Sequence, residues 1–155
     1  MYGHDSWYLC AKLWPNLSKM REVHFLLIDD DSDDREFFKI ALSKLPYSIS
    51  YSTALDGFSA LDILSNSQNN PNFIFLDLNM PLLSGKECLT QIRQMPAHKE
   101  VPVIIFSTSS YQVDIEDCQR LGATHFFTKV HKIELLTKTL QKLISGNKQP
   151  FVLNS

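Results

Sequence analysis

The fold of this chain is decided by the stretch Phe73-Ile74-Phe75-Leu76-Asp77-Leu78-Asn79-Met80-Pro81. Its four leading apolar residues follow a polar, loop-like segment at 68–72, and a proline closes the stretch. A short continuous apolar run of this kind predicts a strand that is buried on both faces, as in a parallel sheet. Asp77 then lies at the C-terminal end of the strand, where a carboxylate can either cap a helix or belong to a site.

Other apolar runs in the chain also end in polar residues. These polar residues are Asp29-Asp30-Asp31 after the run 25–28, Ser107 after the run 101–106, and Lys129 after a short strand predicted at 124–128. A further segment, 47–54, alternates apolar residues with serines, which predicts a strand nearer the edge of the sheet. The sequence therefore predicts five strands.

Helical patterns separate these strands. The first predicted helix has Ser32 as its N-cap and an acidic first turn, and it ends before Pro46. The apolar residues that mark the other four helices are Phe58, Leu61 and Leu64; Cys88, Leu89, Ile92 and Met95; Val113, Ile115, Cys118 and Leu121; and Ile133, Leu136, Leu140, Leu143 and Ile144. Five strand-then-helix units predict a doubly wound, parallel α/β sheet with right-handed crossovers.

In such a sheet, ligand sites lie beyond the carboxyl ends of the strands. Those ends would bring together Asp29, Asp30, Asp77, Ser107 and Lys129. A cluster of carboxylate oxygens suits Mg²⁺, and a cation beside a lysine forms a positive trap for a phosphoryl group. A carboxylate can then act as the nucleophile and form an aspartyl-phosphate. The simpler alternative is that each aspartate caps a helix and the lysine is a surface charge.

Composition excludes some classes of protein. The chain has 155 residues and a formal net charge of −2, and its basic residues are scattered, which gives no sign of nucleic-acid binding. Its three cysteines have neither disulfide-framework nor zinc-site spacing, so we expect a reducing, cytoplasmic location. No apolar run approaches the ~18–20 residues of a membrane span, and Lys12 and Pro15 interrupt any signal-peptide core.

The residues at the strand ends resemble those of a known family. The motifs that carry the resemblance are Ile28-Asp29-Asp30-Asp31, Leu76-Asp77-Leu78-Asn79-Met80-Pro81, Ile105-Phe106-Ser107 and Gly122-Ala123-Thr124-His125-Phe126-Phe127-Thr128-Lys129. Together they resemble the receiver domain of two-component response regulators, of the chemotaxis-type single-domain kind, over residues 22–145. The resemblance implies a flavodoxin-like (βα)5 fold with strand order 2-1-3-4-5.

The resemblance also implies a role for each site residue. Asp77 would be the phosphoacceptor, and Lys129 would bind a phosphoryl oxygen. Mg²⁺ would be held by Asp30 directly, by Asp29 mainly through water, by Asp77, and by the backbone carbonyl of Asn79. Ser107 and Phe126 would be the switch residues: the hydroxyl moves towards the phosphoryl group and the ring turns inward. For Phe126, packing in the core is an equal alternative to the switch role. Asp31 has no implied metal role.

One position departs from the family pattern. The family usually follows its lysine with a proline in a cis peptide, whereas here Val130 follows Lys129. A cis bond before a residue other than proline costs about 2.5–4 kcal/mol. We therefore predict a trans Lys129–Val130 bond and an altered approach of Lys129 to the site.

The implied function is phosphorelay signal transduction. A histidine kinase or phosphotransfer protein would donate the phosphoryl group, and the chain would catalyse its own phosphorylation and dephosphorylation without being an enzyme on external substrates. With no output domain expected, it would signal through a downstream protein bound at the fourth helix, fifth strand and fifth helix. Two alternatives remain: a degenerate receiver that only binds partners, and an aspartyl-phosphate phosphatase that uses the DxD spacing of 29–31.

The two ends of the chain lack the regular strand-then-helix pattern of its centre. We predict an N-terminal extension at 1–21, a receiver domain at 22–146 and a C-terminal tail at 147–155. Within the extension, Trp7, Cys10, Trp14 and Leu17 have helical spacing and could form an amphipathic turn that docks on the domain. Met20 is an alternative natural start.

Overall fold

The computed structural model describes residues 22–66 and 68–154. The strands are β1 (Val23–Ile28), β2 (Ile49–Ala54), β3 (Phe73–Leu76), β4 (Val103–Ser107) and β5 (His125–Thr128). The helices are α2 (Ser32–Ser43), α3 (Gly57–Ser65), α4 (Gly85–Gln94), the 3₁₀ helix η1 (Pro96–His98), α5 (Gln112–Arg120) and α6 (Ile133–Ile144). The amphipathic turn predicted near the N-terminus lies outside the described residues.

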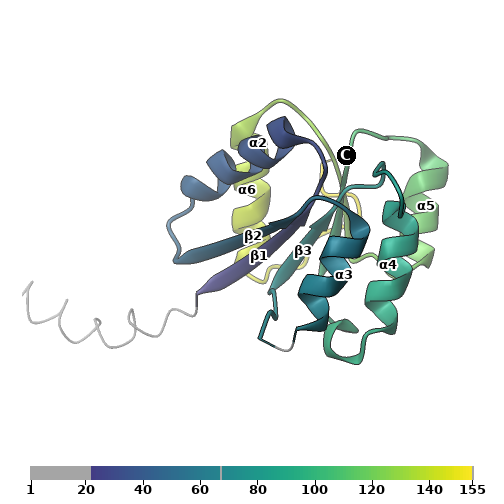
Figure 1. The fold of residues 1–155 in the computed structure, drawn as a ribbon. Coiled ribbons are helices and arrows are strands. Elements are labelled where there is room, and N and C mark those ends of the chain that lie inside the picture. Colours follow the sequence, from purple (N-terminus) through teal and green to yellow (C-terminus); the bar gives the residue numbers. More distant parts are fainter. Residues whose placement is uncertain (1–21, 67, 155) are drawn as a thin grey trace, which may run out of the picture.

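The five strands form one parallel sheet in the order β2-β1-β3-β4-β5. The predicted doubly wound fold and its strand order are therefore confirmed. β2 lies at one edge, as its alternating pattern indicates, and β3, the continuous apolar run 73–76, lies at the centre. Figure 1 shows α2 and α6 on one face of the sheet and α3, α4 and α5 on the other.

The sheet separates two hydrophobic clusters, and β1 contributes alternate residues to each. Leu26 and Ile28 pack with the inner faces of α3, α4 and α5, whereas Phe25 and Leu27 pack with α2 and α6. All four residues are fully buried. Because both faces are covered, the strand has no need of polar residues, and this explains why it reads as a continuous apolar run.

Three apolar residues expected on helices are exposed, and one of them, Leu121, lies just after the end of α5. Phe58 on α3 is 54% exposed and Val113 on α5 is 61% exposed. The buried side chains through which these helices contact the core are Ala60 and Leu64 on α3 and Cys118 on α5. In the described part of the chain, no helix is long and apolar enough to cross a membrane.

Candidate functional site

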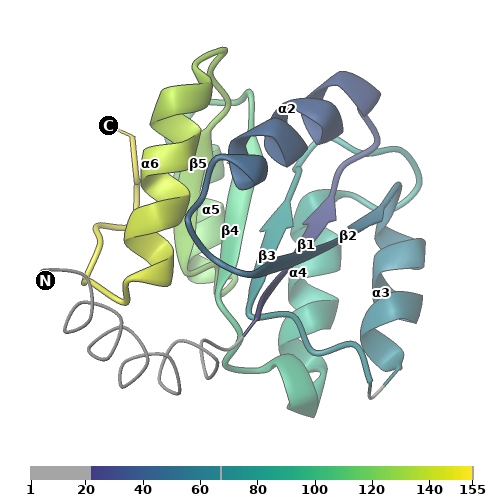
Figure 2. The ribbon, with the colours of Figure 1, turned by 90° about the vertical axis from the view of Figure 1, so that its left-hand side faces the viewer.

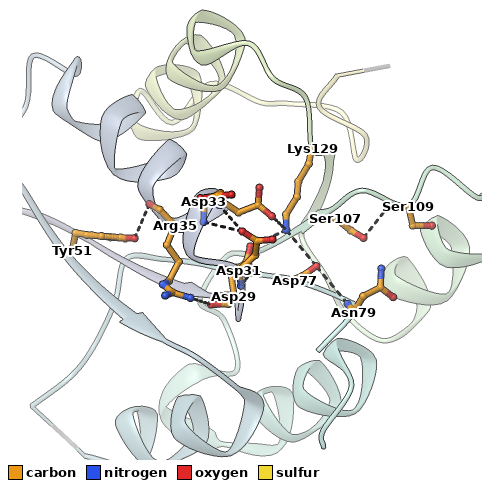
Figure 3. Close-up of polar contacts among 11 residues, drawn as sticks. Asp29, Asp31, Asp33, Arg35, Tyr51, Asp77, Asn79, Ser107, Ser109 and Lys129 are labelled. Atoms are coloured by element: carbon orange, nitrogen blue, oxygen red, sulfur yellow. Dashed lines mark hydrogen bonds and ion pairs between the residues drawn. The ribbon is translucent and has the colours of Figure 1, made fainter. Parts of the chain in front are cut away.

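The carboxyl ends of four neighbouring strands meet at one edge of the sheet (Figure 3). Asp29 directly follows β1, Asp77 follows β3, Ser107 ends β4 and Lys129 follows β5. Their convergence follows from the parallel arrangement, because every strand delivers its C-terminal residue to the same edge. The predicted site residues thus come from segments up to a hundred positions apart in the chain.

Three carboxylates form the centre of this site. One oxygen each from Asp29, Asp30 and Asp77 lies within 4.8 Å of the others. Asp29 is fully buried and Asp77 is 5% exposed, whereas Asp30 faces the solvent. Asp30 and Asp77 line a cavity of about 530 Å³, together with Asp31, Ser32, Asp33, Asp34, Asn79, Thr108 and Lys129, and Asp29 lies behind this lining.

Lys129 is the cation of the cluster. Its Nζ lies 2.8 Å from Asp29 Oδ2, 2.7 Å from Asp34 Oδ2 and 3.6 Å from Asp77 Oδ1. It also lies 5.2 Å from the centre of the Phe106 ring. Burial lowers the pKa of Lys129, but the carboxylates outweigh that effect and raise the pKa above its ordinary value. The side chain therefore stays charged.

The buried oxygen Asp29 Oδ2 lacks a hydrogen bond among the described residues. Lys129 is near it, but the approach does not have the geometry of a hydrogen bond, whereas the contact from Lys129 to Asp34 does. The other oxygen, Asp29 Oδ1, accepts the N–H of Asp31 at 2.9 Å. A buried carboxylate oxygen left in this way is suited to a cation with oxygen ligands.

Burial governs the ionisation of the two inner carboxyl groups. It raises the pKa of Asp77 from 3.8 to about 6, while the charge of Lys129 acts in the opposite direction and that of Asp29 adds to the rise. Burial also raises the pKa of Asp29, against the lowering effects of Lys129 and of the Asp31 N–H. A group that neutralises this cluster would hold both aspartates in the charged form.

Asp31 caps α2, and the prediction of Ser32 as the N-cap is wrong. Asp31 Oδ1 accepts the N–H of Asp33 at 2.8 Å and that of Asp34 at 3.1 Å, so Ser32 is the first residue of the helix. These bonds lower the pKa of Asp31. Serine and aspartate are both good N-cap residues. Asp31 is the N-cap here because its backbone is extended, as an N-cap requires.

Asp34 is a site residue that sequence reasoning missed. The sequence predicts only that it belongs to an acidic first helical turn, yet it accepts a hydrogen bond from Lys129 at 2.7 Å. The available signal was its position in the first turn of the helix that begins at the edge where the strands end. A side chain there can reach the same pocket as the residues after β1 and β5.

The loop from β3 to α4 holds Asp77 and Asn79. The N–H of Asn79 points to Asp77 Oδ1 at 3.4 Å, and Gly85 N–H donates to the Leu78 carbonyl at 2.9 Å. A Cβ on Gly85 would lie 2.3 Å from the Asp77 carbonyl oxygen, so only glycine allows α4 to begin this close to the loop. Helix α4 thereby supports the backbone that carries Asp77.

The two predicted switch residues do not line the cavity. The Ser107 hydroxyl accepts the N–H of Ser109 at 3.1 Å, and Ser109 in turn donates to Asp114 at the start of α5 at 2.5 Å. Lys86 of α4 pairs with the same Asp114 at 2.8 Å, a network that the sequence did not predict. Phe126 is fully buried in the cluster under α3, α4 and α5.

The segment after Lys129 has the predicted peptide geometry. No cis peptide bond occurs between described residues, so the Lys129–Val130 bond is trans. Val130 packs against the cluster under α2 and α6, and Lys129 N–H donates to the Ser107 carbonyl at 2.7 Å. The ammonium lies closer to Asp29 and Asp34 than to Asp77, and the altered approach expected at this position stays a prediction.

Comparison with protein families gives one clear match. The family model described as "Response regulator receiver domain" matches residues 25–141. The response regulator Rcp1 of Synechocystis is 29% identical over 125 residues, which cover 77% of this chain and 85% of Rcp1. The two-component response regulator ARR15 of Arabidopsis thaliana is 30% identical over 83% of this chain and 66% of its own length.

Solved structures agree with the sequence relatives. The Mn²⁺-bound form of Rcp1 is similar with a TM-score of 0.68 and 28% identity, over 79% of this chain and 92% of that one. A phosphorylated cyanobacterial phytochrome response regulator, RcpA, gives a TM-score of 0.73 and 26% identity, over 82% of this chain and 97% of that one. The sensor histidine kinase CheAY of Helicobacter pylori is 29% identical, but this chain spans only 15% of its length.

Proposed function

This chain belongs to the response regulator receiver domain family, and from that premise we propose that it accepts a phosphoryl group on Asp77. The donor is the phosphohistidine of a histidine kinase or phosphotransfer protein. The observation that carries the proposal is the position of the Asp77 carboxylate, at a strand end beside two further aspartates and 3.6 Å from the Lys129 ammonium. The protein acts in two-component signalling as a phosphoacceptor rather than as an enzyme on external substrates.

The proposed reaction is a displacement at phosphorus. An oxygen of the Asp77 carboxylate attacks, the bond to the histidine nitrogen breaks, and the imidazole keeps the electron pair. Lys129 binds one oxygen of the incoming phosphoryl group, which requires its ammonium to move from Asp34 towards Asp77. Water later attacks the same phosphorus, the bond to the Asp77 oxygen breaks, and the carboxylate keeps the electron pair while inorganic phosphate and a proton are released. The chain thus promotes both its phosphorylation and its dephosphorylation.

The residues present fit a divalent cation, and we assign it as Mg²⁺. Asp29, Asp30 and Asp77 would hold it, together with the backbone carbonyl of Asn79. The hydrogen-bond-free Oδ2 of Asp29 and the all-oxygen donor set support this choice, as does the Mn²⁺-bound form of the similar Rcp1. When bound, Mg²⁺ supplies positive charge that offsets the repulsion between the carboxylates and the phosphoryl oxygens.

The conformational response is assigned to Ser107 and Phe126. On phosphorylation the Ser107 hydroxyl would leave the N–H of Ser109 and donate to a phosphoryl oxygen. Because Ser109 also bonds Asp114, this movement would reach the start of α5. Phe126 is fully buried in this conformation, and its ring is assigned to the inward position in the phosphorylated state.

The remaining assignments follow the same premise. The functional unit is the segment 22–146, the location is the cytoplasm, and the downstream partner binds over α5, β5 and α6. The phosphatase alternative would need Asp31 as the second acid of the DxD pair, but Asp31 already caps α2 through two backbone N–H groups. A degenerate receiver would lack an acidic residue or the lysine, and all are present.

The test is labelling of the intact protein with acetyl phosphate and Mg²⁺, followed by mass measurement. We expect one phosphoryl group on the parent chain and none on Asp77→Ala. The matched control is Asp62→Ala, which removes an exposed aspartate on α3 and should be labelled like the parent. Absence of label on the parent, or equal labelling of Asp77→Ala, would overturn the proposal.

A further inference from the structure

The outer side of β5 is paired with a segment near the C-terminus. β5 is the last strand of the five-stranded sheet, yet Phe126 forms a parallel bridge with Val152. The N–H of Phe126 donates to the Phe151 carbonyl at 2.8 Å, and the N–H of Leu153 donates to the Phe126 carbonyl at 2.9 Å. Residues 151–154, called the edge segment below, therefore pair both backbone groups of Phe126. Figure 2 shows the yellow C-terminal stretch of the ribbon beside α6.

Asn154 extends this pairing by one further step. Thr128 N–H donates to Asn154 Oδ1 at 3.0 Å, and Asn154 Nδ2 donates to the Thr128 carbonyl at 2.8 Å. The side-chain amide thus takes the place of a backbone peptide group opposite Thr128. Since Thr128 precedes Lys129, the edge segment holds the backbone next to the candidate site.

The apolar side chains of the edge segment reach both hydrophobic clusters. Phe151 and Val152 pack against the cluster under α3, α4 and α5, and Leu153 packs against the cluster under α2 and α6. Backbone pairing along a sheet edge, with side chains seated on the faces beside it, is the way in which proteins bind extended peptides. The β5 edge consequently has the properties of a peptide-binding surface.

The attachment of the edge segment is suited to exchange. All four of its residues are only half-buried, and the connection from α6 is a short polar stretch, 145–149, with mostly exposed residues. Each of its hydrogen bonds replaces one with water, so the net gain per bond is small. Because the connection 145–149 keeps the edge segment close to β5, the segment rebinds readily after it dissociates. An external peptide segment that makes more contacts with β5 can still replace it.

We propose that the β5 edge is a strand-docking surface that the chain fills with its own residues 151–154, and that a partner protein binds there by presenting an extended segment and displacing them. The partner segment carries consecutive apolar residues followed by an asparagine, as in Phe151-Val152-Leu153-Asn154. This proposal stands on backbone pairing and does not depend on phosphorylation of Asp77.

The test uses the full chain and a peptide with the sequence of residues 149–154, Gln-Pro-Phe-Val-Leu-Asn. Leu153→Pro removes the N–H that donates to Phe126, and Asn154→Ala removes both bonds to Thr128. Asn147→Ala, an exposed residue of the connection, is the matched control. We expect exchange of the Phe126 amide hydrogen to be about tenfold faster in Leu153→Pro, equivalent to about 1.4 kcal/mol.

The same variant should then bind the added peptide, with restored protection of the Phe126 amide. The parent and Asn147→Ala should bind it at least several-fold more weakly, because their own segment competes. Asn154→Ala, which keeps the backbone pairing, should bind the peptide better than the parent, and it decides the question if Leu153→Pro does not fold. Undiminished protection of Phe126 in Leu153→Pro, or no gain in peptide binding by either variant, overturns the proposal.

Discussion

The carboxyl group of Asp77 is buried, and burial disfavours its charged form. Burial raises the pKa of Asp77 from 3.8 to about 6, although Lys129 acts against the rise. The folded chain therefore binds this proton more tightly than the unfolded chain does. The free energy of unfolding therefore decreases as the pH rises from the unfolded-state pKa of Asp77, 3.8, to its folded-state pKa of about 6. Above the folded-state pKa, the full cost of the buried charge is present.

We expect Asp77→Asn to raise the free energy of unfolding by about 3 kcal/mol at neutral pH in the presence of a chelator. The neutral amide removes the buried charge, and the gain should vanish below the unfolded-state pKa, where Asp77 is protonated in both states. Urea unfolding at neutral and acidic pH measures both effects. Asp62→Asn, on the exposed side of α3, should change neither value; a parent and Asp77→Asn of equal stability at neutral pH would contradict the prediction.

At the scale of elements, α4 is fixed against the loop that carries Asp77. The helix begins with a capping box, in which Ser84 Oγ accepts the N–H of Glu87 at 3.3 Å and Glu87 Oε2 accepts the N–H of Ser84 at 2.9 Å. Next to the cap, Gly85 leaves no room for a side chain, since a Cβ would lie 2.6 Å from Leu78 Cα. The start of α4 and the Asp77 loop therefore move together.

We expect Gly85→Ala to lower the free energy of unfolding by about 2–3 kcal/mol, because the methyl group would have to displace backbone atoms. The amide resonances of Asp77 and Asn79 should shift at the same time. The control is Gly146→Ala: a Cβ there contacts nothing within 4 Å, and its φ of +73° predicts a loss of only about 1 kcal/mol. Unfolding in urea measures the first effect, and a Gly85→Ala chain as stable as Gly146→Ala would refute the packing argument.

At the scale of the whole molecule, folding assembles the carboxylate cluster from two distant strand ends. Asp29 and Asp30 follow β1, and Asp77 follows β3, so the unfolded chain has no equivalent set of oxygens. A cation that binds the folded chain alone must stabilise it. The size of that effect depends only on the cation concentration relative to its dissociation constant.

We expect Mg²⁺ at about one hundred times its dissociation constant to raise the free energy of unfolding by about 2.7 kcal/mol. Asp30→Asn should lose this gain while its stability without Mg²⁺ stays within about 0.5 kcal/mol of the parent, because Asp30 is exposed. Asp62→Asn should respond to Mg²⁺ like the parent. An equal response from Asp30→Asn would show that the effect is one of ionic strength rather than of the site.

The sequence alone determined the class of fold and the chemistry at its edge. Continuous apolar runs such as 25–28 and 73–76 predict strands buried on both faces, because burial on two sides leaves no position for polar residues. Residues that follow such runs must meet at one edge once the sheet is parallel. This is why the sequence predicts that Asp77 and Lys129 lie close together.

Only the tertiary structure decided which groups touch. Lys129 has several carboxylates within reach, and its bond to Asp34 rather than Asp77 depends on distances that differ by less than an ångström. The cap at Asp31 depends on the backbone conformation of one residue. The pairing of Phe126 with residues 151–154 uses backbone groups, which every residue has, so no pattern of side chains predicts it.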